Sequence, residues 1–179
     1  HKEYRRQRQM CIRDSGKTIF DMLKRKSKGE SVVVMEGDEK LWEITKQYNH
    51  DEFSDNESSL GYGIDVYQES INKVFREYLV NYDYLTRMLE NYGFVLLTRQ
   101  ETRDLNLPDS TGLFNDLFGI MKTEMKKSKR AVNEYGDAAK MSPGEKKISF
   151  LNRYFIYKKV RNVDADTITL NLLGTSISE

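Results

Sequence analysis

The chain has 179 residues, and its 29 Lys and Arg residues almost balance its 28 Asp and Glu residues, for a formal net charge of +1. No apolar run is long enough to span a bilayer, so we expect no membrane association. A single Cys excludes a disulfide framework and a cysteine metal site. A reducing, intracellular setting fits this composition best.

The first 15 residues are set apart by their sequence. Arg5–Ser15 spells RRQRQMCIRDS, which matches one reading frame of an adapter used in DNA sequencing libraries. We interpret residues 1–15 as this adapter artefact, and the alternative is a basic, disordered arm that touches nucleic acid. They hold five basic residues, two acidic residues and the only Cys, so residues 16–179 carry a formal charge of −2. That remainder is long enough for one domain, and we expect its gene to begin upstream of Gly16.

A helix and a hairpin are the first predicted elements. A helix is predicted over 18–24, because its apolar residues recur at helical spacing and the basic run 24–28 suits a helix C-terminus. The β-branched and apolar runs 31–35 and 41–44 flank a Glu-Gly-Asp-Glu turn, which predicts a hairpin. The polar, acidic stretch 47–59 is predicted to form an exposed loop.

A strand, a long helix and a second strand are predicted across Tyr62–Leu97, around which we expect the domain to be organised. Apolar residues recur every three or four positions between Ile71 and Tyr92, the spacing of a helix with one broad buried face. Gly93 supplies a left-handed stop, and the apolar run Phe94–Leu97 is typical of a buried strand. A buried strand directly after an amphipathic helix indicates a layered α/β domain.

Two further helices and a strand are predicted in the second half of the chain. Helical spacing resumes over 113–125, and the basic run Lys122–Arg130 is interpreted as a solvated helix end, with contact to RNA phosphates as the alternative. Residues 142–145, Ser-Pro-Gly-Glu, have the chemistry of a capping box at a helix start. The aromatic and β-branched segment 153–160 predicts a strand, and we treat 164–179 as a C-terminal tail.

Short catalytic motifs give no assignment. Gly61-Tyr62-Gly63 precedes a predicted strand instead of a helix, so it does not form a dinucleotide-binding fingerprint. Gly16-Lys17-Thr18 resembles the end of a phosphate-binding loop, but the upstream glycine of that motif would fall within residues 1–15. One His remains after residue 15, so a histidine-based triad has no second histidine to draw on. Composition and spacing alone indicate an α/β domain without a defined activity.

Two blocks of the sequence resemble a known family. The block at 61–94 reads GYGIDVYQESINKVFREYLVNYDYLTRMLENYGF, and the block at 141–163 reads MSPGEKKISFLNRYFIYKKVRNV. Both are similar to the C-terminal part of the mRNA cap guanine-N7 methyltransferases. The similarity is greatest to the methyltransferase domain of the capping enzymes of large DNA viruses, and it covers residues 16–163 in the right order.

The resemblance implies a C-terminal fragment of a class I, Rossmann-like methyltransferase that depends on S-adenosylmethionine. We therefore expect an α/β fold whose mixed sheet ends in antiparallel closing strands. In the family, the methyl donor is held by early strands and a glycine-rich loop, which we expect to lie upstream of Gly16. This fragment would supply the side that binds capped RNA (GpppRNA), without a catalytic residue or a metal.

Two cap-binding positions follow from the resemblance. The family's Glu-aromatic-Leu-Val element reads the cap guanine and matches residues 77–80, in which the Glu77 carboxylate would accept both donors on the Watson–Crick edge. The alternative for Glu77 is an i to i+4 ion pair with Lys73 on the predicted helix. The tyrosine that opens the last family strand matches Tyr154, whose ring would pack against the purine or, alternatively, be an ordinary half-buried strand aromatic.

The implied reaction is transfer of a methyl group from a sulfonium to guanine N7, which needs no general base because N7 has a free lone pair. An alternative from another class is a non-catalytic RNA-binding or subunit-interaction module that keeps the fold. The viral resemblance further implies guanylyltransferase and triphosphatase domains upstream on the same polypeptide and a stimulatory subunit as a partner. It also implies a location in the virion or the host cytoplasm.

Overall fold

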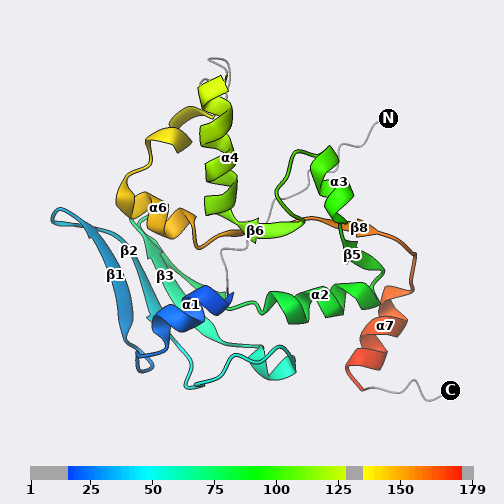
Figure 1. Cartoon of the computed structure of the whole chain (residues 1–179). Coiled ribbons are helices and arrows are strands. Elements are labelled where there is room, and N and C mark those ends of the chain that lie inside the picture. The colour runs from blue at the N-terminus through cyan, green and yellow to red at the C-terminus, as the bar shows by residue number, and fades with distance from the viewer. Residues whose placement is uncertain (1–15, 128–134, 175–179) are drawn as a thin grey trace, which may run out of the picture.

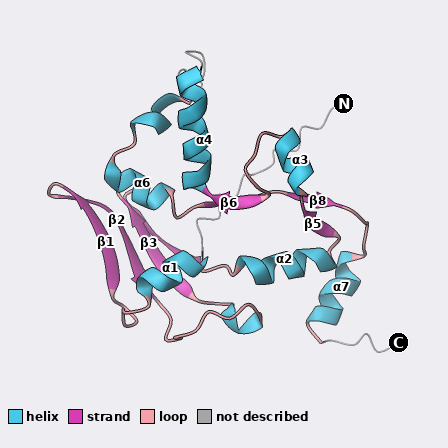
Figure 2. Cartoon of the chain, viewed as in Figure 1, coloured by secondary structure: helices cyan, strands magenta, loops and turns pink. Residues whose placement is uncertain are grey.

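The computed structural model describes residues 16–127 and 135–174 of the chain. The predictions for residues 1–15 and for the end of the basic run, 128–130, lie outside these ranges. The described part combines six α-helices with a four-stranded antiparallel sheet and two short two-stranded ribbons (Figures 1 and 2). A mixed α/β class is therefore confirmed. Every strand pair in the described part is antiparallel, so these residues do not display the parallel sheet of a methyltransferase fold.

The first half of the chain forms α1 (Gly16–Leu23) and the four-stranded sheet in the order β1-β2-β3-β4. The strands are β1 (Ser31–Glu36), β2 (Glu39–Lys46), β3 (Gly63–Gln68) and β4 (Lys73–Tyr78). The predicted helix at 18–24 and the predicted hairpin are confirmed. In β2, every second residue from Trp42 onward is buried, because alternate side chains of a strand point to one face of the sheet.

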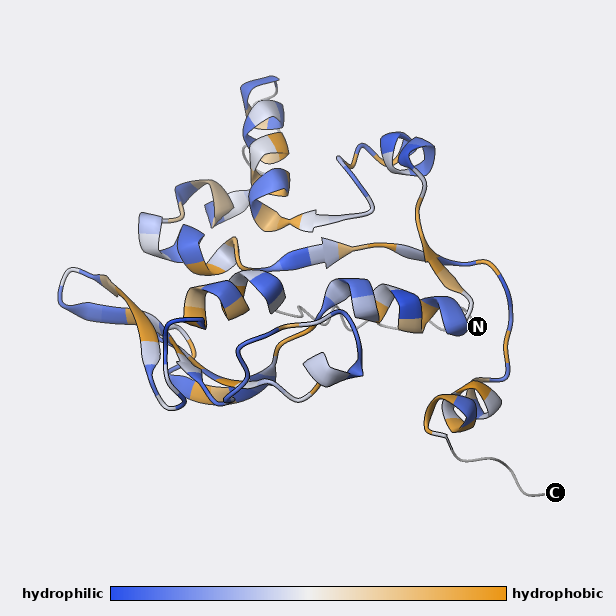
Figure 3. Cartoon of the chain, turned by 60° about the horizontal axis from the view of Figure 1, so that its bottom comes forward, coloured by the Kyte–Doolittle hydropathy of each residue, from blue (hydrophilic) through white to orange (hydrophobic). Residues whose placement is uncertain are grey.

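The hydrophobic core lies between α1 and one face of this sheet. The helix α1 carries both hydrophobic and hydrophilic residues (Figure 3). Its apolar residues form one stripe, which is buried against the sheet. The buried residues of the core are Ile19, Phe20, Leu23, Trp42, Ile44, Tyr48, Tyr62, Ile64, Val66 and Leu79. The 47–59 segment is mainly exposed, as predicted, but Tyr48 is only 5% exposed because its ring stacks on Tyr62 at a centroid distance of 4.9 Å.

The long helix predicted between Ile71 and Tyr92 is wrong in its first half. That region forms the turn after β3 and then β4, and Asn72 takes a left-handed conformation with φ of 51°. The helix α2 (Tyr82–Asn91) begins only after Asn81, whose Oδ1 accepts the N–H groups of the second and third residues that follow it, at 3.1 and 3.2 Å. The helical geometry required for an i to i+4 pair between Lys73 and Glu77 is therefore absent.

The second half of the chain builds two ribbons and four further helices around them. Its elements are β5 (Phe94–Leu96), α3 (Arg99–Asp104), β6 (Thr111–Leu113), α4 (Phe114–Lys127), α6 (Pro143–Ser149), β7 (Arg153–Phe155), β8 (Tyr157–Lys159) and α7 (Ala165–Leu172). Short 3-10 turns lie at Glu57–Ser59 and Gly136–Lys140. β5 pairs with β8 and β6 with β7, so one late segment, 153–159, completes both ribbons (Figure 1).

Several predictions for this half are confirmed and one element was missed. α4 matches the helix expected at 113–125, and the Ser142 hydroxyl with the Glu145 side chain forms the predicted capping box. The strand expected at 153–160 is present as the two short strands β7 and β8. α7, capped by the Asp164 carboxylate, lies in the segment treated as a tail. Within the described ranges, no helix has both the length and the apolar character needed to cross a membrane.

Candidate functional site

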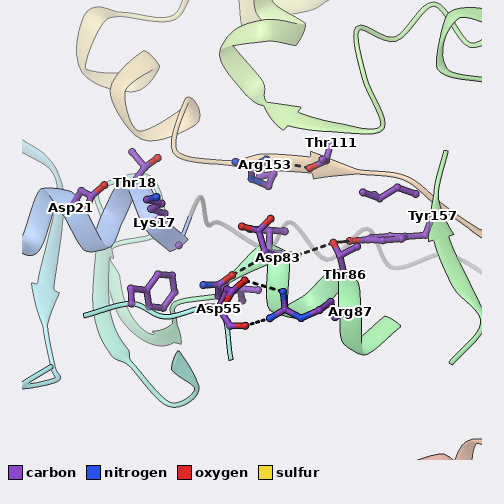
Figure 4. A pocket seen from close by; sticks show the side chains of 16 residues that line it. Lys17, Thr18, Asp21, Asp55, Asp83, Thr86, Arg87, Thr111, Arg153 and Tyr157 are labelled. Atoms are coloured by element: carbon purple, nitrogen blue, oxygen red, sulfur yellow. Dashed lines mark hydrogen bonds and ion pairs between the residues drawn. The ribbon is translucent and has the colours of Figure 1, made fainter. Parts of the chain in front are cut away.

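A cavity of about 640 Å³ lies where α1, the 53–55 loop, α2 and the two ribbons meet (Figure 4). This volume falls in the range of about 300–1,000 Å³ that is typical of small-molecule sites. Lys17, Thr18 and Asp21 line it from α1, and Asp83, Thr86 and Arg87 line it from α2. Thr111 of β6 and Arg153 of β7 form the wall across from α2, and Tyr157 of β8 lies at one end (Figure 4).

One wall of the cavity depends on a close approach of two backbones. Gly16, the first residue of α1, lies against Val80 in the link between β4 and α2, and both line the cavity. A Cβ atom at Gly16 would lie 2.7 Å from the carbonyl carbon of Val80 and closer still to its oxygen. A glycine is therefore required for α1 to start at this point.

Polar contacts hold the 53–55 loop against α2. An Arg87 guanidinium nitrogen lies 2.9 Å from a carboxylate oxygen of Asp55, and the guanidinium also donates to the Asp55 carbonyl. Asn81, the N-cap of α2, donates from Nδ2 to the carbonyl of Ser54 at 3.0 Å. Since both partners of the ion pair line the cavity, Arg87 and Asp55 neutralise each other there.

Arg153 is a cation without an anionic partner in the described part of the chain. Its guanidinium carbon lies 4.9 Å from the centroid of the Tyr82 ring, and Nη1 donates to Thr111 Oγ1 at 3.3 Å. Its Nε is buried and has no hydrogen-bond partner among the described residues. None of the ion pairs between described residues involves Arg153. The side chain is thus held in place with part of its hydrogen-bonding capacity unused.

Tyr157 presents a fixed aromatic ring to the same cavity. Thr86 Oγ1 donates to the carbonyl of Tyr82 at 2.8 Å and also lies 2.8 Å from the Tyr157 hydroxyl. Because the single hydroxyl proton of Thr86 is used in the first bond, Tyr157 is the donor in the second. Phe155 packs between Tyr82 and Tyr157, with centroid distances of 6.0 and 5.7 Å. These contacts orient the aromatic side of the cavity.

The cavity therefore suits a planar, polar ligand that carries both hydrogen-bond donors and an anionic group. It offers aromatic rings, a hydroxyl, and the free cation Arg153, while Arg87 and Asp55 are paired with each other. Lys17 adds a second cation, and Asp21 and Asp83 add carboxylates that accept hydrogen bonds from donors on a ligand. Among the described residues, no group of three or more His, Cys, Asp or Glu side chains is placed to hold a metal ion.

Glu77 does not line the cavity. On β4 it pairs with Ile64, so its side chain lies on the core face of the sheet. It lines a small, separate crevice with apolar neighbours, among which are Ile19 of α1 and Leu151 after α6. This crevice and the cavity have no lining residue in common.

Tyr154 lies on the opposite side of β7 from the cavity. Since Arg153 faces the cavity, strand alternation turns Tyr154 away from it and toward Gly112 of β6. A Cβ atom at Gly112 would lie 2.9 Å from the Tyr154 ring, which shows how closely the ring packs. Burial raises the pKa of the Tyr154 phenol, and the nearby Asp116 and Asp109 carboxylates add to the shift. The structure does not bring Tyr154 and Glu77 together.

Arg153, Tyr157 and Tyr82 were not singled out from the sequence. Arg153 and Tyr157 fall in the block at 141–163. The alternation of side chains along the predicted strand could have indicated that they share one face. It places Arg153, Phe155 and Tyr157 on one side and Tyr154 on the other. A search of protein families and of curated proteins finds no match for the chain.

Proposed function

We propose that the chain forms the cap-binding side of an mRNA guanine-N7 methyltransferase and holds the guanosine of GpppRNA for cap 0 formation. The observation that carries this proposal is the meeting of the two family-like blocks at one cavity. Tyr82, Thr86 and Arg87 come from the block at 61–94, and Arg153 and Tyr157 come from the block at 141–163. Segments far apart in the chain thus converge on a volume that fits a nucleotide.

The chemistry of the cavity supports a cap nucleotide as its ligand. A cap guanosine combines a planar base with a chain of negatively charged phosphates. Tyr157 offers an aromatic face for the base, and Arg153, held over the Tyr82 ring, offers its remaining guanidinium donors to a phosphate. The resemblance assigns guanine recognition to Glu77, whose side chain lines a separate crevice. A carboxylate there would accept the two adjacent donors of guanine, whereas adenine presents a mismatched edge.

The described residues support a role in substrate binding and not in binding the methyl donor. S-adenosylmethionine would need a glycine-rich loop between a parallel strand and a helix, and the described residues, with antiparallel strand pairs throughout, do not fit it. We therefore propose that donor binding is a task of residues upstream of Gly16. The part proposed for this chain is to bind the guanine and its phosphates in a fixed orientation.

The proposal is tested by the binding of cap dinucleotides to the 179-residue chain. We expect GpppG to bind more tightly than ApppA, and Glu77→Gln to lose most of this preference, because the amide replaces one acceptor by a donor. Loss of a hydrogen bond to a charged group, about 1.5–3 kcal/mol, corresponds to roughly 10–100-fold in affinity for GpppG. Titration calorimetry measures both affinities, with methyl transfer by the intact gene product as the second assay.

A second variant tests the cation. Arg153→Met removes the guanidinium but keeps an apolar stem, and we expect it to weaken GpppG and ApppA alike, because the phosphates are common to both. The matched control is Arg103→Met on α3, an exposed arginine that does not line the cavity. Equal affinities for GpppG and ApppA in the unmodified chain would contradict cap recognition. Binding of RNA without regard to the cap would favour the RNA-binding module.

A further inference from the structure

A second hollow lies at the opposite end of α1 from the cavity. This crevice, of about 340 Å³, is lined by five cationic side chains: Lys24, Arg25, Lys26, Lys28 and Lys46. Asp51 is the one carboxylate among its described lining residues. We call this set of five cations the basic crevice. Its excess of positive charge makes it a candidate for binding a polyanion.

The cations of the basic crevice are not neutralised within the described part of the chain. None of the ion pairs between described residues involves any of the five. The C-terminal end of α1 favours nearby positive charge, but this effect amounts to only about 0.3–1 kcal/mol per exposed residue. The exposed cations among them, Lys24, Arg25 and Lys28, are therefore available to an external anion.

A buried lysine holds the crevice in shape. Lys46, at the end of β2, is only 3% exposed, and its Nζ donates to the carbonyl of Lys26 at 2.9 Å. The same ammonium lies 4.9 Å from the centroid of the Tyr48 ring. Backbone hydrogen bonds join Gly29 to Lys46 and Lys46 to Glu30, at 2.7 and 3.0 Å. The backbone of the basic segment after α1 is thus fastened to the sheet.

A third hollow lies between the basic crevice and the cavity. It measures about 320 Å³ and shares Lys17, Asp21 and Phe53 with the cavity. It shares Lys24 and Asp51 with the basic crevice, so the three hollows adjoin one another along α1. Lys17 and Lys24 are seven residues apart, which corresponds to about 10 Å along a helix axis. We call these three adjoining hollows the α1 groove.

We infer that the RNA chain that follows the cap leaves the cavity through the α1 groove and that its phosphates bind the basic crevice. The inference rests on the proposed function for the position of the cap. The groove has cations at its two ends and the half-buried ring of Phe53 between them, and a base can stack on this ring. The carboxylates of the hollow between these ends, Asp21, Asp51 and Glu52, outnumber its two lysines, so this stretch would accept hydrogen bonds from base amino groups and 2′-hydroxyls and would not hold phosphates. An acidic peptide lacks the series of flat bases that would stack on Phe53, so single-stranded RNA is the occupant that we infer.

The test compares a capped RNA with the cap dinucleotide on the 179-residue chain. The variant Arg25→Gln/Lys28→Gln removes two cations of the basic crevice. The control Lys73→Gln/Lys147→Gln removes two exposed lysines of β4 and α6, which line neither the cavity nor the α1 groove. Affinity for a labelled ten-nucleotide GpppRNA is measured at several salt concentrations, alongside affinity for GpppG at one concentration.

We expect the Arg25/Lys28 variant to bind the capped RNA more weakly and to lose about 1.4 from the slope of log affinity against log salt, at about 0.7 for each phosphate contact on a single strand. Its affinity for GpppG should not change, and the control should match the unmodified chain in both assays. An unchanged slope in the Arg25/Lys28 variant would overturn the inference. Equal loss of affinity for poly-glutamate and RNA in that variant would overturn the choice of RNA.

The same data separate this inference from the proposed function. If the unmodified chain does not distinguish GpppG from ApppA but the slope for RNA still falls in the Arg25/Lys28 variant, cap recognition is wrong and the groove still binds RNA. If GpppG is distinguished and the slope does not fall, the cap site remains and the RNA path is wrong.

Discussion

Replacement of Gly16 by alanine tests the backbone contact that closes the cavity beside α1. The new Cβ would lie 2.7 Å from the carbonyl carbon of Val80. The position of a Cβ is fixed by its own backbone, and the Val80 atom belongs to backbone, so neither can turn aside as the end of a flexible side chain would. Such overpacking costs about 1–3 kcal/mol. Alanine recovers roughly 0.5–1 kcal/mol relative to glycine in a helix. The net result is a destabilisation of about 1–2 kcal/mol.

Thermal and urea unfolding of the two alanine variants Gly16→Ala and Gly119→Ala measures this effect. Gly119 lies on the exposed side of α4, and a Cβ atom there meets nothing within 4 Å, so we expect a gain of about 0.5–1 kcal/mol. For a chain of this size, each kcal/mol moves the Tm by roughly 2–4 °C. The same chemical change should thus lower the Tm at one glycine and raise it at the other. A Gly16→Ala variant as stable as Gly119→Ala would refute the contact.

Three further predictions concern the core, a helix cap and an acidic transition. Leu23→Ala, at a side chain that is fully buried between α1 and the sheet, should cost about 2–5 kcal/mol in urea unfolding, and a loss below 1 kcal/mol would contradict the core assignment. Ser142→Ala removes the capping box of α6 and should cost about 1 kcal/mol, whereas Ser58→Ala, a serine whose side chain caps nothing, should change little. The Lys158 ammonium, followed by donors from Thr98, lowers the pKa of Glu101 from 4.5 to about 2. Because the pKa is lowered in the folded state, the stabilisation is present above pH 4.5 and is lost as the pH falls toward about 2. Glu101→Gln should show a smaller fall in Tm over this range, and an equal fall would contradict the pairing with Lys158.

The parts of the fold that follow from the sequence are those set by local chemistry. The apolar spacing of α1, the turn between β1 and β2, and the Ser142 capping box each depend on residues within one or two turns of chain. The helix expected from Ile71 failed because apolar residues at helical spacing also fit an edge strand whose side chains stay partly exposed, such as Val74 at 62%. The polar signals in that segment were Asn72 at the turn and Asn81 at the true helix start.

The candidate site follows from the sequence only in part, because it is assembled by non-local pairing. The resemblance pointed to two segments that do approach one cavity, but it selected Glu77, which lines a separate crevice, and Tyr154, on the far side of β7. The position of Arg153 depends on the pairing of β7 with β6, and that of Tyr157 on the pairing of β8 with β5. Such pairings join residues about 40–65 positions apart, and no local pattern encodes them.

During synthesis on the ribosome, β5 and β6 emerge well before the strands with which they pair. The four-stranded sheet and α1 have all their residues once Tyr78 has been added, so this unit can fold early. β5 and β6, in contrast, obtain their partners only from 153–159, and until then each presents an unpaired edge. A chain stopped before Arg153 would carry a folded sheet and two unmatched strands, the form in which association with chaperones or with other nascent chains is most favourable.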